Sequence, residues 1–206
     1  MADTVSLAQL LHTAMATYKP HGNMSKKKHY MVLDTETATS ATVPFDIAYT
    51  IVDRAGHVVE QRNYLVEEMF NSPLGRHILL NDDFSKNKME NYLSILQECG
   101  TTSFAAIREE MRQTIKDFNC VVVAYNAQFD YDNLTNFAQS LGFKNFFKDS
   151  TEVWDLWNIA LHILADSRRY VNFCVANDFV SDKGNLKSSA EVMYRFLMND
   201  TNFVEA

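Results

Sequence analysis

Two acidic residues, Asp34 and Glu36, follow an apolar run at 30–33 and are separated by a single threonine. Alternate side chains of a β-strand face the same way, so both carboxylates are expected on one face, with Thr35 and Thr37 on the other. Neighbouring carboxylates at the end of a buried strand repel each other and lose hydration unless a cation or a proton lies between them. The pattern therefore points to a divalent metal ion bound by oxygen ligands. The alternative is two acids exposed to solvent at a strand end.

A third acid, Asp130, ends the stretch 124–130, which directly follows the apolar run 120–124. Alone, Asp130 would be an acid in the first turn of a helix, where the macrodipole favours negative charge. Ligands of open α/β sheets gather beyond the carboxyl ends of parallel strands, so this acid is expected beside Asp34 and Glu36. Oxygen ligands without a Cys or His cluster favour Mg2+ or Mn2+ over zinc.

The segments around these acids predict an α/β fold. Residues 45–52 alternate between large apolar and smaller or polar side chains, 53–56 has the Asp and Gly of a tight turn, and 57–66 supplies a returning strand. These strands form an antiparallel meander with the acidic strand. The run 120–124 is β-branched without polar alternation, as in a central parallel strand that is covered on both faces.

The remaining segments are predicted to be helical. A helix at 7–18 precedes the main fold, apolar residues recur at helical spacing behind the candidate cap Ser103, and Gly142 stops a later helix. A further helix is expected over 153–164 and should be largely buried. The last helical region is expected over 168–206, with a break at 181–185. We predict a mixed sheet, an antiparallel meander plus parallel strands, flanked by helices. The expected organisation is an N-terminal helical appendage at 1–24 and one domain at 25–206.

Composition narrows the class of protein. The chain has 206 residues, 47% of them hydrophobic, and a formal net charge of -7, so it lacks the basic excess of most nucleic-acid binders, although a metal-carboxylate site is itself acidic. Cys99, Cys120 and Cys174 form no C-x-x-C pair, so neither a disulfide framework nor a zinc site is indicated, and we expect a cytoplasmic protein. No apolar run approaches the roughly 20 residues of a membrane span, and the N-terminus is a poor signal peptide.

Segments 32–37 and 125–130 together resemble two motifs of the DEDD family of 3'-5' exonucleases, in its phage and bacterial forms, which include ribonuclease T and the proofreading subunit of DNA polymerase. The resemblance implies an RNase H-like fold and hydrolysis of single-stranded DNA or RNA from the 3' end, with release of nucleoside monophosphates. It implies two Mg2+ or Mn2+ ions, with Asp34 bridging both, Glu36 binding the ion that activates water, and Asp130 holding the second. A homodimer or a polymerase-type partner would be consistent with it.

The same resemblance suggests substrate contacts. A terminal nucleotide would rest against the backbone around Thr35 to Thr37, with Phe129 and Phe45 as apolar support. The favoured alternative for both aromatics is a place in the core. Asn126 would orient Asp130 or cap the following helix. The lysine run at 26–28 would contact a phosphate backbone or simply lead into the strand.

The third family motif, a His or Tyr followed closely by a fourth Asp, has no counterpart at the expected place. His12, His21, His29, His57, His77 and His162 all lie elsewhere. Asp155 is expected to be an N-cap, and Asp166 and Asp178 are expected to be surface acids. Since residues 198–206 resemble the lead-in to the missing motif, we expect a C-terminally truncated exonuclease with weak or no activity. The alternative is a nucleic-acid-binding or protein-binding module of the same fold.

Overall fold

The computed structural model describes residues 29–38, 42–165 and 167–204. The predicted helix at 7–18, the appendage at 1–24, the lysine run at 26–28 and Asp166 lie outside these ranges.

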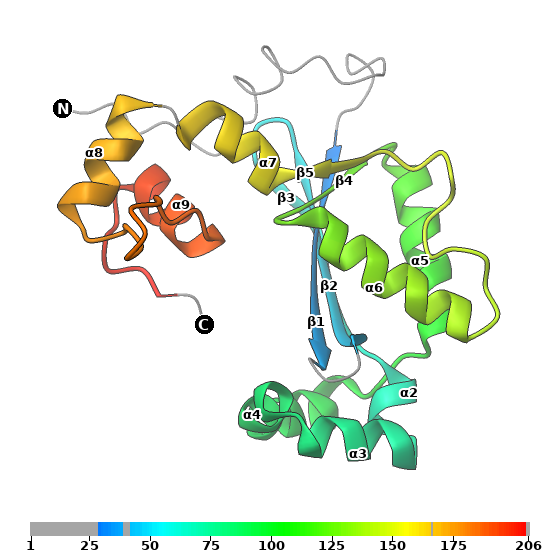
Figure 1. Ribbon diagram of the computed structural model, residues 1–206. Coiled ribbons are helices and arrows are strands. Elements are labelled where there is room, and N and C mark those ends of the chain that lie inside the picture. The colour runs from blue at the N-terminus through cyan, green and yellow to red at the C-terminus, as the bar shows by residue number, and fades with distance from the viewer. Residues whose placement is uncertain (1–28, 39–41, 166, 205–206) are drawn as a thin grey trace.

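Five strands of the described residues form one sheet in the order β3-β2-β1-β4-β5 (Figure 1). The strands are β1 (His29–Ala38), β2 (Val43–Asp53), β3 (Val58–Leu65), β4 (Val121–Ala124) and β5 (Val153–Asp155). β1, β2 and β3 form the antiparallel meander, while β4 pairs in parallel with both β1 and β5. The prediction of a mixed sheet, with a meander and parallel strands, is confirmed.

The register of the β1–β2 hairpin determines which side chains face each other. Leu33 pairs with Tyr49, and Glu36 pairs with Asp46, just before a register shift that follows Glu36. Paired residues of antiparallel strands point to the same face. Asp46 therefore accompanies Glu36, while Leu33 and Tyr49 contribute to the opposite, apolar face.

Helices cover the Leu33 face and one end of the sheet. The described helices between the meander and β5 are α2 (Glu67–Phe70), α3 (Pro73–Asn81), α4 (Asp83–Cys99), α5 (Phe104–Asp117) and α6 (Ala127–Ser140). Ser103 caps α5 by accepting a hydrogen bond from the Ala106 amide, as predicted. In Figure 1, α5 and α6 lie beside the sheet, whereas α2, α3 and α4 gather near the carboxyl end of β1.

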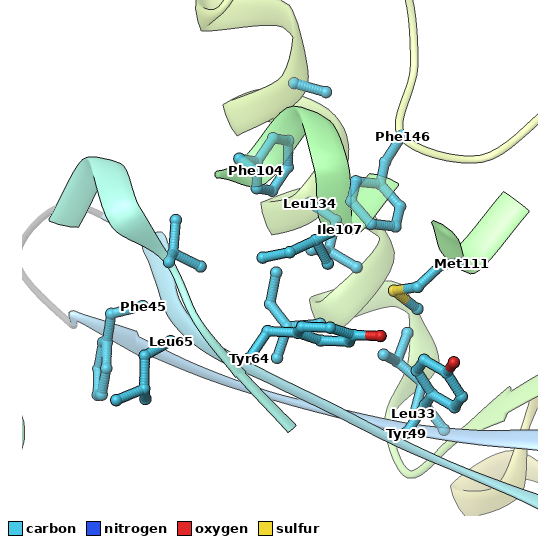
Figure 2. Packing of buried hydrophobic residues seen from close by; sticks show 14 of the residues in the cluster. Leu33, Phe45, Tyr49, Tyr64, Leu65, Phe104, Ile107, Met111, Leu134 and Phe146 are labelled. Atoms are coloured by element: carbon cyan, nitrogen blue, oxygen red, sulfur yellow. The ribbon is translucent and has the colours of Figure 1, made fainter. Parts of the chain in front are cut away.

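The main core lies between the sheet and helices α5 and α6. Figure 2 shows Phe104, Ile107 and Leu134 from these helices gathered above the strands, with Phe146 from the loop before β5 beside them. All four are fully buried. This packing fixes α6 against the sheet and thereby sets the position of its first turn, where Asp130 lies.

The C-terminal helices form a second apolar cluster. They are α7 (Leu156–Ala160), the π-helix η2 (Leu161–Ala165), α8 (Arg168–Ala176) and α9 (Ala190–Met198), and Figure 1 shows α8 and α9 away from the sheet. Tyr170 and Cys174 are fully buried in this cluster, with Val192 and Met193 nearly so. The predicted break at 181–185 is confirmed and is wider than expected, since α8 ends at Ala176 and α9 begins at Ala190. The expectation that the last helix continues beyond Met198 was wrong, because residues 199–204 are not helical.

The prediction of one largely buried helix over 153–164 is correct for 156–164, which are helical in α7 and η2, and wrong for 153–155 and for the extent of burial. Residues 153–155 form the edge strand β5 instead, and α7 buries none of its residues fully. Trp154 is buried because it lies in β5 beside Val123 of β4 and contacts Tyr30. Among the described residues, no helix combines the length and apolarity that a membrane span requires.

Candidate active site

Strand β1 presents its acids as the alternation predicts. The side chains of Thr35 and Thr37 are buried, each with 6% exposure, whereas Asp34 is exposed and Glu36 is partly exposed. Burial and the charge of Glu36 raise the pKa of the Asp34 carboxyl, and the charge of Lys88 opposes this increase. The two carboxylates are therefore close enough to repel each other measurably.

Asp46 adds a third carboxylate on the same face. It lies on β2 opposite Glu36, is 8% exposed, and its Oδ1 atom is buried without a hydrogen-bond partner among the described residues. Burial raises its pKa to about 6, and the charges of Glu36 and Asp34 add to the increase, while a hydrogen bond from Tyr92 works against it. An acidic oxygen without a partner in this position favours a bound cation or a proton.

A lysine from α4 stands among these acids. Lys88 Nζ lies 2.7 Å from Glu36 Oε1 in an ion pair whose side chains are 35% and 29% exposed. Both residues line a cavity of about 300 Å³ between the sheet and α4. The other polar residues that line it are Asp34, Asp46, Asn63, Asn91 and Tyr92.

Asp130 reaches the opposite side of β1. It lies in the first turn of α6, just after β4, and its buried carboxylate accepts a hydrogen bond of 2.6 Å from the Thr35 hydroxyl. Burial raises the pKa of Asp130 to about 6, the hydrogen bond from Thr35 lowers it, and the charge of Asp34 raises it. The charge of Asp34 thus acts on Asp130 across β1, but Asp130 does not line the cavity at Asp34 and Glu36. The predicted convergence of these three carboxylates on one pocket is not formed among the described residues.

The donor groups suit a hard divalent cation in type, because the three acids on β1 and β2 offer only carboxylate oxygens and one of these oxygens has no partner. Their arrangement does not yet form a site, however. Among the described residues, no group of three or more His, Cys, Asp or Glu side chains is placed to hold a metal ion. A cation would require at least the Lys88–Glu36 pair to separate.

The two aromatic residues predicted to contact substrate differ in exposure. Phe129 is 46% exposed and available to a ligand, but Phe45 is 0% exposed and packs edge-on against Phe70 and Tyr92. Phe45 is therefore a core residue, and its assignment to substrate binding was wrong. Because Thr35 and Thr37 bury their side chains, these two residues could contact a nucleotide only through their backbone.

Asn126 occupies the N-cap position of α6 in the left-handed conformation, with φ 62° and ψ 51°. Its side chain makes no capping hydrogen bond, so the capping interpretation fails at the level of the side chain. The preceding residue, Tyr125, donates a hydrogen bond to the Ser188 carbonyl and thereby ties the second motif to the C-terminal helices.

Asp155 is the N-cap of α7, as predicted, because its carboxylate accepts hydrogen bonds from the Trp157 and Asn158 amides. Together with Asn158 and His162, it lines a second cavity of about 310 Å³. None of the residues that line this cavity also lines the cavity at Asp34. His162 thus belongs to a different part of the surface from the acids of β1.

Among solved structures, exonuclease I is similar in fold. Its product-bound form aligns with 82% of this chain at 14% identity and a TM-score of 0.53. The apo form gives 0.52 at 14% identity, and the complex with the inhibitor BCBP gives 0.52 at 15% identity, each over 82% of this chain. The chain shares the fold of the aligned part of exonuclease I.

The similarity to exonuclease I confirms the architecture that the two sequence motifs implied. At 14–15% identity, this similarity is evidence for the fold alone. The alignments span 38%, 37% and 36% of these exonuclease I chains, so the present chain corresponds to well under half of their length. No protein-family model matches the sequence, and no protein with a curated description matches it.

Two residues of the exonuclease-fold site were missed by the sequence analysis. Asp46 interrupts the apolar strand 45–52, and counting back through the hairpin from the turn at 53–56 would have placed it near Glu36. Lys88 carries no such signal, because the contact between α4 and β1 joins residues 52 positions apart in the chain.

Proposed function

We propose that this protein is a metal-dependent 3'-5' exonuclease that acts on single-stranded DNA or RNA ends and releases nucleoside monophosphates. The observation that supports the proposal is the pair Asp34 and Glu36 on one face of β1, with Asp130 near Asp34 on the other side of the strand, where it accepts a hydrogen bond from Thr35. Exonuclease I, which has a similar fold, has been observed with its product bound.

The residues would divide the work as follows. Asp34 and Glu36 would hold one divalent cation, and Asp34 and Asp130 would share a second. Such a cation supplies Lewis acidity, which favours formation of the nucleophile and offsets charge on the phosphate being transferred. Thr35 fixes the orientation of the Asp130 carboxylate through its hydroxyl.

Substrate positioning would come from the surface beside Asp130. The half-exposed ring of Phe129 offers an apolar face against which a terminal base can stack. The backbone at 35–37 lies on the strand that carries both acids, so a nucleotide held there would bring its phosphate near them. The net charge of -7 makes a cation between the acids and the phosphate necessary for binding.

A catalytically weak binding module is the second candidate function. It is favoured by the Lys88–Glu36 ion pair and by the absence, among the described residues, of a formed three-ligand metal group. The sequence also lacks the third motif at its expected place, and members of such a site act as a unit. We therefore expect cleavage by this chain to be slow compared with that of an enzyme that has all the motifs.

The test is incubation of the full chain with a 5'-labelled single-stranded oligonucleotide and Mn2+. We expect slow, stepwise shortening from the 3' end, abolished by Asp34→Asn, since this change removes a ligand charge while preserving side-chain shape. The matched control is Asp132→Asn on the exposed side of α6, where Asp132 bonds only to Gln128. This control should cleave like the unchanged protein.

Shortening that survives Asp34→Asn would contradict the proposed catalytic role of β1. If no variant shortens the strand, fluorescence anisotropy with the same oligonucleotide separates the two candidates. Mn2+-dependent binding that is lost in Asp34→Asn would support the binding module, and the lack of any binding would exclude both functions.

A further inference from the structure

The cavity beside β1 contains more negative than positive charge. Asp34, Glu36 and Asp46 all line it, and Lys88 is the single basic residue among the described residues that do so. Three carboxylates around one cavity repel one another unless cations neutralise them. Within the described ranges, the only positively charged group in contact with any of them is the ammonium of Lys88, at 2.7 Å from Glu36 Oε1.

The Lys88 side chain has two stabilising contacts but remains partly exposed to solvent. Its Nζ lies 4.6 Å from the centroid of the Phe84 ring, one turn earlier on α4. Both partners of the ion pair are about one third exposed, so water can replace the contact when a stronger ligand for Glu36 arrives. The ammonium therefore occupies a coordination position of Glu36 reversibly.

We propose that Lys88 is a tethered competitor of the divalent cation at Glu36. The inference rests on the proposed function, because it concerns the same cation site. A cation can take Oε1 of Glu36 only after Lys88 Nζ leaves it, and the nearby ammonium repels an ion that approaches either oxygen of Glu36. Lys88 thus offsets the charge of Glu36 in the absence of a cation and weakens binding of the cation itself.

The competition also predicts where Lys88 goes. Its four-carbon stem lets the ammonium swing out of the cavity while α4 stays fixed. Once Glu36 is engaged, Lys88 is a free positive charge at the rim of an acidic cavity, available to a phosphate of the substrate. Binding of the cation and binding of the phosphate would then favour each other, because the cation competes with Lys88 for Glu36 and the phosphate competes with Glu36 for Lys88.

The experiment measures Mn2+ affinity of the full chain without substrate, by the electron paramagnetic resonance signal of free Mn2+. We expect Lys88→Met to bind Mn2+ at least about tenfold more tightly than the unchanged protein, because a repelling charge a few ångström away is removed. Lys88→Arg keeps the charge and should stay within about twofold. Lys86→Met, an exposed position on the same helix, is the matched control and should also stay within about twofold.

Asp34→Asn separates failure of the inference from failure of the proposed function. If Mn2+ binding depends on Asp34 but Lys88→Met binds no more tightly than the unchanged protein, the competitor role is overturned and the cation site stands. If binding is absent, or unaffected by Asp34→Asn, both are overturned.

A second readout follows the lysine itself. In protein with 13C-labelled lysine, the Lys88 side-chain signal, identified by its loss in Lys88→Met, should shift when Mg2+ is added. The shift should disappear in Glu36→Gln, because this change removes the charge that Lys88 and the cation share. A Lys88 signal that Mg2+ leaves unmoved while Mn2+ binds at Asp34 would overturn the proposal.

Discussion

Three acids around strand β1 have raised pKa values, and burial is the largest cause for each. Asp46 and Asp130 are raised to about 6, and Asp34 is raised as well. A neighbouring acid adds to each increase: Glu36 for Asp34, Glu36 and Asp34 for Asp46, and Asp34 for Asp130. Several carboxyls with raised pKa values close together are typical of functional sites.

Asp46→Asn should stabilise the protein at neutral pH. A carboxyl whose pKa rises from 3.8 to about 6 on folding binds protons more tightly in the folded state, so the free energy of unfolding falls as pH rises between these values and stays lower above them. Asparagine does not ionise, so the variant does not show this fall in the free energy of unfolding. In a chelating buffer we expect its free energy of unfolding to exceed that of the unchanged protein by about 1–2 kcal/mol at about pH 7.5 and by little at about pH 4.

Urea unfolding followed by tryptophan fluorescence at both pH values measures this difference. An equal offset at the two pH values would show that the effect does not arise from ionisation of Asp46.

Thr35→Val tests the link between β1 and Asp130. The change keeps the shape of the side chain but removes the hydroxyl that donates to the buried Asp130 carboxylate at 2.6 Å. Leaving that oxygen without its donor should lower the free energy of unfolding by about 1–3 kcal/mol. Thr35→Ser, which keeps the hydroxyl, is the control in the same urea titration. Equal loss in both variants would mean that methyl packing, rather than the hydrogen bond, matters at this position.

At the scale of elements, the β1–β2 hairpin and the β4–α6 junction deliver the acids. The hairpin places Asp46 beside Glu36 through its register, and the junction places Asp130 just beyond the end of β4. Both features follow from local sequence patterns, a two-residue alternation and an apolar run before a helix. The hairpin register also determines the side to which Phe45 points, and its burial agrees with the alternative that it is a core residue.

Asn126→Gly should leave stability nearly unchanged. Asn126 adopts φ 62° and ψ 51° without a side-chain capping bond, and glycine adopts this conformation without strain. We expect a change within about 0.5 kcal/mol for glycine and a loss of about 1 kcal/mol for Asn126→Ala, which brings a Cβ atom without the local bonding of Asn. Thermal unfolding of the three proteins gives the comparison. A large loss on substitution by glycine would reveal a stabilising contact of the Asn126 side chain.

At the scale of the molecule, the meander and the central parallel strand of the sheet could be predicted from the sequence. The edge strand β5 and the packing of α4 against the sheet could not. The meander and the parallel β4 each had a continuous local pattern. Residues 153–155 did not, because three residues are too few to reveal a two-residue alternation, and their pairing with β4 is long-range. For the same reason the approach of α4 to β1, which brings Lys88 to Glu36, had no local signal.

The C-terminal helices are joined to the sheet by specific bonds as well as by the chain. Tyr125 donates to the carbonyl of Ser188, and Trp157 Nε1 donates to the Ser188 hydroxyl oxygen at 3.0 Å. The first bond connects the segment before α9 to the residue that follows β4, and the second connects this segment to α7. The α8–α9 cluster is therefore positioned to affect the region of Asp130 even though its own core is separate.

The central claim is that the acids of β1 share a divalent cation. Crystals of the full chain grown with Mn2+ and measured at an anomalous-scattering wavelength test it directly. We predict an anomalous peak about 2.0–2.5 Å from carboxylate oxygens of both Asp34 and Glu36, with Lys88 moved away from Glu36. A map without a peak at these two residues, or with its only strong peak at another part of the surface, would contradict the account.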